Sequence, residues 1–406
     1  MSQSLSKFEQ KLLVTTCFGH FLSHFNMLIF PALIIPLQNQ LNLTLSEVLQ
    51  LSFWMYLLFG ITAFPWGIMA DKWDVRKLFS IFYLGAGISA IAAGLLCHDP
   101  FWFSVALTGI GLFSGIYHPV GLGWISKEVR QVSISLGYNG MFGNLGLASA
   151  PLIAGILNWF WGPDIVYMFV GVLNLFGLVV LWLLSDSKQT AINPMENKKS
   201  NSGNLLAFFI LLFAMMTGGL VLRGALTITP SYFEIRGNEI TEWISSVLEF
   251  SFSGNLVSTS ITSLIFLIGM MGQYTGGKIA SRYSLRYSYL LFHAITIPLA
   301  IGISYLFNLP LMLCAIVYFF FLLGMQPIEN TLVAKYTPSK IRHSAFGFKF
   351  VVTFGGGAFA IKIIGFMEHQ FGLSSIFQLL AVFSIVLIFI IFILIYITGR
   401  QIKNSG

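Results

Sequence analysis

A few histidines lie within otherwise apolar stretches of this 406-residue sequence. His20 and His24 are four residues apart, so on a helix they would share one face, and His118 falls in a later apolar stretch. Imidazole can relay a proton near neutral pH or bind a transition metal. The three side chains therefore suggest a proton relay or a metal site, although they could also simply hydrogen-bond neighbouring helices.

Charged side chains occur in the same apolar context farther along the chain. Arg223 and Lys349 would be fixed positive charges there, and Glu329 is the best candidate for a carboxyl group that binds and releases a proton. A structural ion pair between Arg223 and Glu329 is the alternative interpretation of both residues, and Lys349 could extend towards water instead. The remaining candidates for solute binding or coupling are Tyr117, Asn139, Gln326 and Asn330.

The overall composition is typical of a membrane protein. Apolar residues make up 56% of the chain and charged residues only 9%, with a mean hydropathy of +0.82, whereas roughly a quarter of the residues of soluble proteins are charged. A charge at the bilayer centre costs about 2.5–3.5 kcal/mol, so the candidates above should face a partner or water. No polar stretch is long enough for a separate catalytic domain, and we expect neither an enzyme nor a cofactor.

Twelve apolar stretches of helical length organise the chain. Six precede a polar segment and six follow it, which predicts an N-terminal six-helix bundle over 1–184, a linker over 185–204 and a C-terminal six-helix bundle over 205–406. The stretches are continuously apolar, which favours helices over barrel strands. They fall at about 12–37, 47–69, 78–96, 101–125, 134–158, 164–184, 205–230, 255–277, 287–307, 309–330, 344–367 and 373–398.

Lysine and arginine are distributed asymmetrically over the predicted loops. Of the 22 such residues, all but Arg223, Arg236, Lys349 and Lys362 lie in the two ends, the linker and every second loop. Positively charged loops stay on the cytoplasmic side during membrane insertion. We therefore expect both termini and the linker to be cytoplasmic.

The two halves of the chain repeat each other. The segment 67–76 aligns without gaps on 277–286, at an offset of 210 residues. At the same offset Gly137, Gly146, Gly155 and Gly162 fall on Gly347, Gly356, Gly365 and Gly372, and Asn139 falls on Lys349. Agreement of these two independent segments at one offset indicates an internal duplication. Alignment of Pro31 with Pro230 pairs His24 with Arg223, and alignment of Pro119 with Pro327 pairs His118 with Gln326.

The segment 67–76 resembles the signature of the major facilitator superfamily, with Gly67, Asp71 and Arg76 at the characteristic positions. The resemblance implies an all-α membrane fold with twelve helices in two pseudo-symmetric bundles. It places spans 1, 4, 7 and 10 around a central cavity, with spans 5 and 11 beside it, and the polar candidates fall on these helices. It also implies that Asp71 meets the start of span 11 and closes the cytoplasmic side. The gating residues of both copies are Gly67, Asp71, Arg76, Gly277, Arg282 and Arg286.

Three shorter segments resemble the fosmidomycin-resistance type of transporter within that superfamily. These are 19–36 in span 1, 115–121 in span 4, and Arg223 seven residues before Pro230 in span 7. That branch usually has an acid at the position of His24, so coupling through a carboxylate at this position is in doubt. The resemblance to the branch implies export.

Together these features predict a secondary active transporter that moves a small polar or amphipathic organic solute by alternating access, with proton-coupled efflux. We expect a monomer in a bacterial inner membrane, whose partners are the solute, protons or another coupling ion, and membrane lipid, but no nucleic acid. One alternative is transport of a metal ion or a siderophore-like metal chelate bound by His20, His24 and His118. Another is a receptor that transports nothing.

Overall fold

The computed structural model describes residues 5–185, 203–338 and 342–404, and all regular structure in these residues is helical. Twelve helical segments are long and apolar enough to cross a membrane. The predicted all-helical membrane fold is therefore confirmed, and most of the predicted linker lies outside the described residues. The spans are Lys7–Ala32, Leu45–Ala70, Val75–Leu95, Pro100–Glu128, Ile134–Trp161, Pro163–Leu183, Leu205–Arg236, Gly254–Arg282, Leu285–Tyr305, Asn308–Tyr336, Ala345–Phe371 and Ser374–Gly399.

Several spans are divided into shorter helices. The N-terminal half contains α1 (Lys7–Ala32), α2 (Ile34–Leu41), α3 (Leu45–Leu51), α4 (Phe53–Ile61), α5 (Ala63–Ala70), α6 (Val75–Leu95), α7 (Pro100–Ser114), α8 (Tyr117–Glu128), α9 (Val132–Trp161) and α10 (Pro163–Ser185). The C-terminal half contains α11 (Leu205–Arg236), α12 (Asn238–Val247), α13 (Gly254–Arg282), α14 (Leu285–Tyr305), α15 (Asn308–Gly324), α16 (Gln326–Tyr336), α17 (Arg342–Phe350), the π-helical turn η2 (Val351–Gly355), α18 (Phe359–Phe371) and α19 (Ser374–Asn404).

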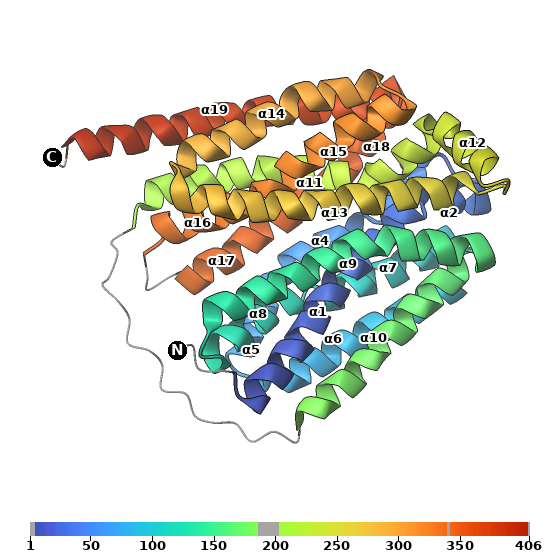
Figure 1. The fold of residues 1–406 in the computed structure, drawn as a ribbon. Coiled ribbons are helices and arrows are strands. Elements are labelled where there is room, and N and C mark those ends of the chain that lie inside the picture. Colours follow the sequence, from blue (N-terminus) through green and yellow to red (C-terminus); the bar gives the residue numbers. More distant parts are fainter. Residues whose placement is uncertain (1–4, 186–202, 339–341, 405–406) are drawn as a thin grey trace.

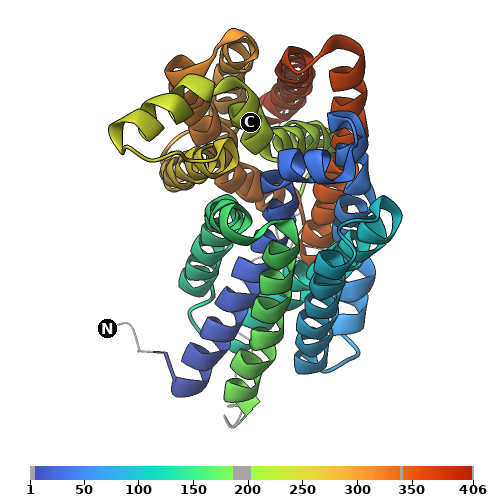
Figure 2. The same cartoon turned by 90° about the vertical axis from the view of Figure 1, so that its right-hand side faces the viewer.

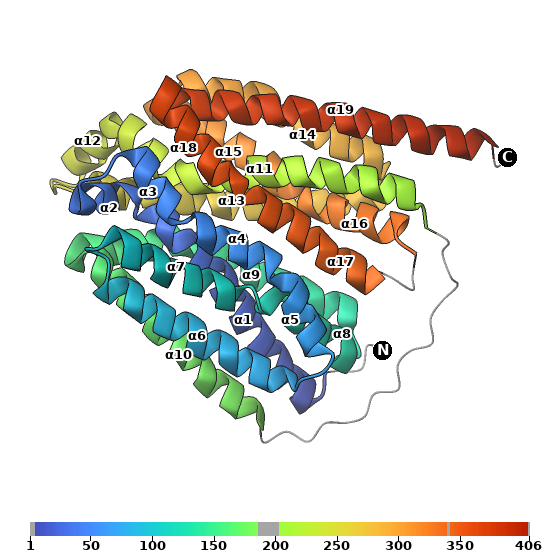
Figure 3. The ribbon, with the colours of Figure 1, turned by 180° about the vertical axis from the view of Figure 1, so that it is seen from behind.

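The helices form two bundles that lie side by side (Figure 1). One bundle contains α1–α10 and the other α11–α19; Figure 2 views both from the right-hand side of Figure 1. The start of α1, the end of α10, the start of α11 and the end of α19 all lie at one end, which we call the linker end; the opposite end is the distal end (Figure 1). The bundles meet along two seams, α9 against α13 and, seen from behind, α3–α5 against α17–α18 (Figure 3).

The structure reproduces the sequence duplication at equivalent glycines. Gly162 and Gly372 each follow a span at positive φ, 87° and 79°, where glycine avoids the strain that a side chain would cause. A methyl group at Gly67 would lie 3.3 Å from Cβ of Pro119, and one at Gly277 would lie 3.9 Å from Cβ of Pro327. Equivalent helices therefore pack in the same way in both halves.

The two bundles are tightly packed from their middle to the distal end. A methyl group at Gly155 would lie 1.9 Å from Thr259 Oγ1, and one at Gly60 would lie 2.1 Å from the backbone nitrogen of Gly355. Near the linker end, by contrast, a methyl group at Gly137 or Gly347 would meet no atom within 4 Å. In the same direction α10 and α19 diverge (Figure 1). The distal end is therefore the closed end of the interface.

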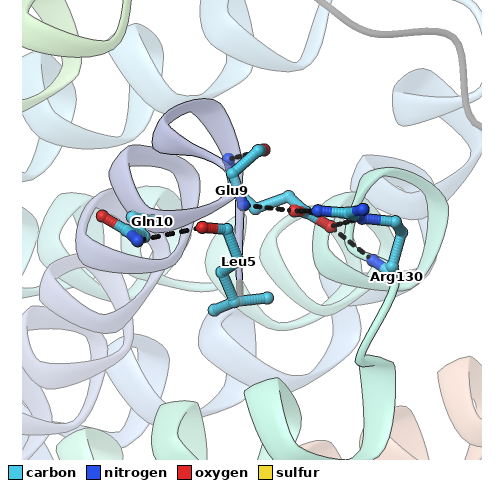
Figure 4. Close-up of polar contacts among 5 residues, drawn as sticks. Leu5, Glu9, Gln10 and Arg130 are labelled. Carbon is cyan, nitrogen blue, oxygen red and sulfur yellow. Dashed lines mark hydrogen bonds and ion pairs between the residues drawn. The ribbon is translucent and has the colours of Figure 1, made fainter. Parts of the chain in front are cut away.

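The start of α1 is fixed by a network that the apolar pattern does not reveal. The Ser6 hydroxyl accepts a hydrogen bond from the Glu9 backbone N–H, while the Glu9 carboxylate accepts one from the Ser6 N–H. The same carboxylate accepts hydrogen bonds from the backbone N–H of Arg130 at 2.8 Å and from its Nη2 at 2.7 Å (Figure 4). The carboxylate raises the pKa of the Arg130 guanidinium. The helix consequently begins at Lys7 rather than at the predicted residue 12.

Candidate functional site

The three predicted histidines meet in the N-terminal bundle. One ring nitrogen from each lies within 4.8 Å of the others. The ring centroids of His20 and His24 are 4.9 Å apart, and His118 lies 5.3 Å from His20 and 5.2 Å from His24. Residues 20 and 24 come from one face of α1, and His118 comes from the start of α8. We call these three residues the histidine cluster.

His20 is held by residues of α8 and α9. Its Nδ1–H donates to the backbone carbonyl of Asn139 at 2.8 Å, so in the neutral ring Nε2 carries the free lone pair. The Tyr117 ring stacks on it at 4.8 Å. Tyr117 and Asn139 also hydrogen-bond each other through their side chains, at 2.7 Å and 2.9 Å. Tyr117 and Asn139 are therefore positioned to fix the orientation and tautomer of His20.

His118 faces the C-terminal bundle. Its ring stacks on Phe350 at 4.9 Å and lies 5.4 Å from Phe354 and 5.7 Å from Phe59. The side chain is buried, and neither ring nitrogen has a hydrogen-bond partner in the described residues. Phe350 is the last residue of α17, directly before η2, and Phe354 lies within η2; π-helical turns often occur at functional sites. Phe59, Phe350 and Phe354 form what we call the aromatic wall.

Arg223 reaches the same region from α11. Its Cζ lies 4.1 Å from the centroid of the Tyr56 ring on α4, and its side chain is within electrostatic range of His24. The residue is only 7% exposed, yet its Nη1 has no hydrogen-bond partner in the described structure. The ion pair with Glu329 that the sequence suggested as an alternative does not form. The ion pairs of the described residues include Lys127–Asp71 and Arg130–Glu9, and Arg223 is not a member of either.

Glu329 is instead bound within the C-terminal bundle. Its Oε1 accepts a hydrogen bond from Tyr289 Oη at 2.7 Å, and the residue is 4% exposed. Lys349 lies within electrostatic range of this carboxyl group and donates to Asn330 Oδ1 at 2.5 Å. Gln326 accepts a hydrogen bond from Gln273 at 3.1 Å. The structure thus brings Glu329, Asn330 and Lys349 together. This group adjoins the histidine cluster, because Lys349 lies within electrostatic range of His118 and the neighbouring Phe350 stacks on the His118 ring.

The predicted gating residues lie near the linker end. Asp71 pairs at 3.2 Å with Lys127 of its own bundle, and both side chains are exposed. It does not form an ion pair with the start of span 11 in the described residues, so the implied latch stays a prediction. Gly67 packs against Pro119, and Gly277 faces Pro327. The backbone N–H of Arg76 donates to Asp74 Oδ1. Arg282 is exposed, and Arg286 donates a hydrogen bond to Thr398 on α19.

Sequence reasoning missed the aromatic partners of the charged residues and one bridge between the bundles. Tyr56 under Arg223 and Tyr289 beside Glu329 are two of 14 tyrosines, and no local pattern distinguishes them. Asn144 on α9 and Gln273 on α13 exchange amide hydrogen bonds of 2.5 Å and 3.1 Å across the interface. The 210-residue offset could not reveal this bridge. It relates equivalent positions of the two halves, whereas Asn144 lies on span 5 and Gln273 on span 8, which are not equivalent spans.

Comparison with known proteins decides the family. The sequence profile of the Major Facilitator Superfamily matches residues 16–361. The chain belongs to this superfamily. It is therefore a membrane transporter and not an enzyme, as the sequence predicted, and its two-bundle fold is the one expected for the family.

Individual members of the superfamily are distant in sequence. A putative metabolite transport protein of Haemophilus influenzae is 22% identical over 406 residues, covering 95% of this chain and 96% of that protein. A bacterial homolog of the human lysosomal transporter Spinster, solved inward-facing and unoccupied, has a TM-score of 0.77 at 14% identity and covers 96% and 97% of the two chains. A D-xylose–proton symporter has a TM-score of 0.73 at 13% identity, covering 95% and 97%. These similarities show the fold, and the narrower resemblance to fosmidomycin-resistance transporters stays a prediction.

Proposed function

We propose that this protein is a secondary active transporter that moves a small polar or amphipathic organic solute by alternating access. The observation that carries the proposal is the convergence of buried and half-buried polar side chains from both bundles on one interface. His24 and His118 come from the N-terminal bundle, and Arg223 from the C-terminal bundle. Polar and charged groups within a membrane are costly, and they usually face a solute, an ion or a water-filled path.

Protons are the proposed coupling ion. Glu329 is a buried carboxyl group whose one hydrogen bond to Tyr289 leaves its other oxygen able to take up a proton. The histidine cluster adds titratable groups on the other side of the interface. The structural similarity to a D-xylose–proton symporter is consistent with this coupling. In this proposal Glu329 carries the proton while the histidines tune affinity for the solute.

The linker end faces the cytoplasm in this proposal. The lysines and arginines of the loops support this orientation, because positively charged loops stay on the cytoplasmic side. The bundles are then closed towards the outside and separated towards the cytoplasm, which is the state expected to take up a solute for export. The solute leaves when the bundles rock and the distal end opens.

Flux measurements on the purified protein test this function. The full chain would be reconstituted in liposomes with a pH gradient, and uptake of labelled organic solutes would be compared with protein-free liposomes. The proposal predicts protein-dependent flux of at least one solute, which stops when a protonophore removes the gradient. Absence of protein-dependent flux over solutes of every charge class would contradict it.

Transport of a metal ion or metal chelate is the second candidate, because the histidine cluster offers three nitrogen ligands. A tetrahedral zinc ion with bonds of 2.0–2.1 Å requires nitrogens only about 3.3 Å apart, so the rings would have to approach one another. Arg223 and Lys349, which lie within electrostatic range of the cluster, would repel a divalent cation. The geometry therefore supports the organic solute better. Zinc binding that is lost in His20→Ala, His24→Ala and His118→Ala would favour the metal.

A further inference from the structure

Nη1 of the Arg223 guanidinium has a hydrogen-bonding capacity that no described protein group uses. The residue is more than nine-tenths buried, and its Nη1 has no partner among the described residues. The Tyr56 side chain supplies a cation–π contact at 4.1 Å and a hydrogen-bond partner for the guanidinium, but Nη1 remains available. A buried charge is normally paired. The free N–H groups lie at the interface of the two bundles, where a solute would bind.

Two further hydroxyl groups continue the same face of α11. Thr227 and Ser231 follow Arg223 at intervals of four residues, which places the three side chains in one row along the helix. Both hydroxyl groups are buried; that of Ser231 has no hydrogen-bond partner among the described residues, and that of Thr227 lies beside the Tyr56 hydroxyl. The row therefore combines a fixed positive charge with neutral donors, a combination suited to an oxyanion.

The charges around the interface are not balanced. Glu329 lies next to Lys349, so the single carboxyl group of this region is accompanied by a cation of its own. Arg223 takes part in no ion pair among the described residues. One positive charge thus remains without a counterion, and the attraction between opposite charges is stronger away from bulk water. The region favours a solute that carries a negative charge.

An apolar surface lies beside Arg223. Tyr56, on which the guanidinium rests, and Phe59 are three residues apart on α4. Phe59 contacts Phe354 at 5.4 Å, and Phe354 stacks on Phe350 at 5.5 Å. Tyr56 and the aromatic wall therefore form a series of rings between Arg223 and His118, which can cover an apolar or aromatic portion of a solute.

We infer that the solute is a small organic anion. Its carboxylate or phosphoryl oxygens bind Arg223, with Thr227 as an additional donor, and its apolar part packs against the aromatic wall. The inference rests on the proposed transport function and adds to it the charge class of the solute and the residue that selects it. The planar guanidinium can hold either oxyanion through two parallel hydrogen bonds.

Thermal stabilisation of the full chain in detergent tests the inference with four probes that share one phenyl ring. Phenylacetate and phenyl phosphate are anions, phenylacetamide is neutral and phenethylamine is a cation. A ligand that binds only the folded state raises Tm. The two anions should raise Tm, and the neutral and cationic probes should not. The more stabilising anion distinguishes a carboxylate solute from a phosphoryl one.

Variants at position 223 connect the effect to the guanidinium. Arg223→Gln should weaken the apparent affinity for the anions about 10- to 100-fold, the range expected for loss of hydrogen bonds to a charged group. Its Tm without ligand should stay the same or rise, because an unpaired buried charge is removed. Arg223→Lys should retain part of the affinity. Lys362→Gln is the matched control. It removes an exposed cation of span 11 that lies over the Phe53 ring of span 2, and it should bind like the wild type.

Any one of three results would overturn the inference. The first is stabilisation by the neutral or cationic probe that equals that of the anions, and the second is anion binding that Arg223→Gln leaves unchanged. The third is failure of both anions to raise Tm. Flux in proteoliposomes separates this inference from the proposed function. Protein-dependent flux of only neutral or cationic probes would remove the charge class and keep the transporter, whereas no flux of any probe would count against both.

Discussion

At the scale of single residues, Glu329 and Arg223 differ in how their charges are accommodated. The carboxyl group of Glu329 has Tyr289 as a donor and Lys349 within electrostatic range. Among the described residues Arg223 has the side chain of Tyr56 as its partner, and its Nη1 is unpaired. A group with nearby partners can change its protonation state while remaining in place, whereas the guanidinium stays charged at all accessible pH values. The two residues therefore suit different tasks, proton exchange and anion binding.

Glu329→Gln should abolish accumulation driven by a pH gradient while solute exchange continues. The amide can still accept the hydrogen bond from Tyr289, but it cannot release a proton. Accumulation in proteoliposomes should fall by about tenfold or more, to the level of passive equilibration. Glu242→Gln, an exposed change on α12, is the control. If Glu329→Gln still accumulates solute with an unchanged pH dependence, Glu329 is only a structural partner of Tyr289 and Lys349.

His24→Ala should reduce the pH dependence of solute binding below neutral pH. His24 is surrounded by His20, His118 and Arg223, with Lys349 near His118. Protonation would add positive charge beside Arg223, so binding of an anion should strengthen on acidification in the wild type. The slope should be smaller in His24→Ala and in His118→Ala. The exposed His369→Ala should keep it, and an unchanged slope in both cluster variants would exclude this role.

At the scale of helices, the interface depends on how closely the backbones of α9 and α13 approach. Gly155 allows Thr259 of the opposite bundle to approach its backbone near the distal end, while the region around Gly137 near the linker end of the same helix is open. Small residues permit such close crossings in membranes. The distal end of α9 is therefore in close contact with the opposite bundle, and its linker end would make such contact only when the bundles rock.

Gly155→Leu should prevent closure of the distal end and reduce transport. A side chain there would overlap Thr259, so the bundles would separate at this end. A single cysteine at Ser258, in a background without Cys17, Cys97 and Cys314, should become several-fold more reactive to an impermeant thiol reagent added from the distal side. Gly137→Leu is the matched variant. It should leave this labelling low and reduce transport by obstructing the linker end, and equal labelling in both variants would contradict the account.

At the scale of the molecule, the sequence predicts the architecture because membrane insertion leaves a strong signal. Span length and apolar character follow from the thickness of the bilayer, so all twelve spans are found close to their predicted positions. The duplication predicts that Gly162 and Gly372 are equivalent, and their φ angles agree. Span boundaries are less predictable. The first span begins earlier than predicted because of the Ser6–Glu9 capping box, and the predicted 12–37 helix is divided at Leu33.

The site is only partly predictable for a different reason. His24 and Arg223 stand out because charged or titratable groups are rare in apolar sequence, and the structure places them within electrostatic range of each other. Partners such as Tyr56 and Tyr289 are ordinary aromatic residues of a membrane protein, and only the packing of distant helices selects them. The pairing of Asp71 with Lys127 likewise depends on how closely the ends of α5 and α8 approach each other, which the family resemblance did not give.

Topology is a property of the whole chain, and cysteine labelling can test it. A cysteine that replaces Lys198 in the linker should react only with reagent on the cytoplasmic side, and one that replaces Ser246 on α12 should react only from outside. The asymmetry of loop charges provides the physical reason. Both cysteines reacting from the same side would contradict the twelve-span arrangement.

The central claim is that solute movement is coupled to proton movement through the interface of the two bundles. The most direct measurement is the pH inside proteoliposomes, reported by a trapped fluorescent dye, when a transported solute is added to one side without an imposed gradient. The account predicts a solute-dependent pH change that is present in the wild type and absent in Glu329→Gln. Protein-dependent solute movement with no accompanying pH change in the wild type would contradict it.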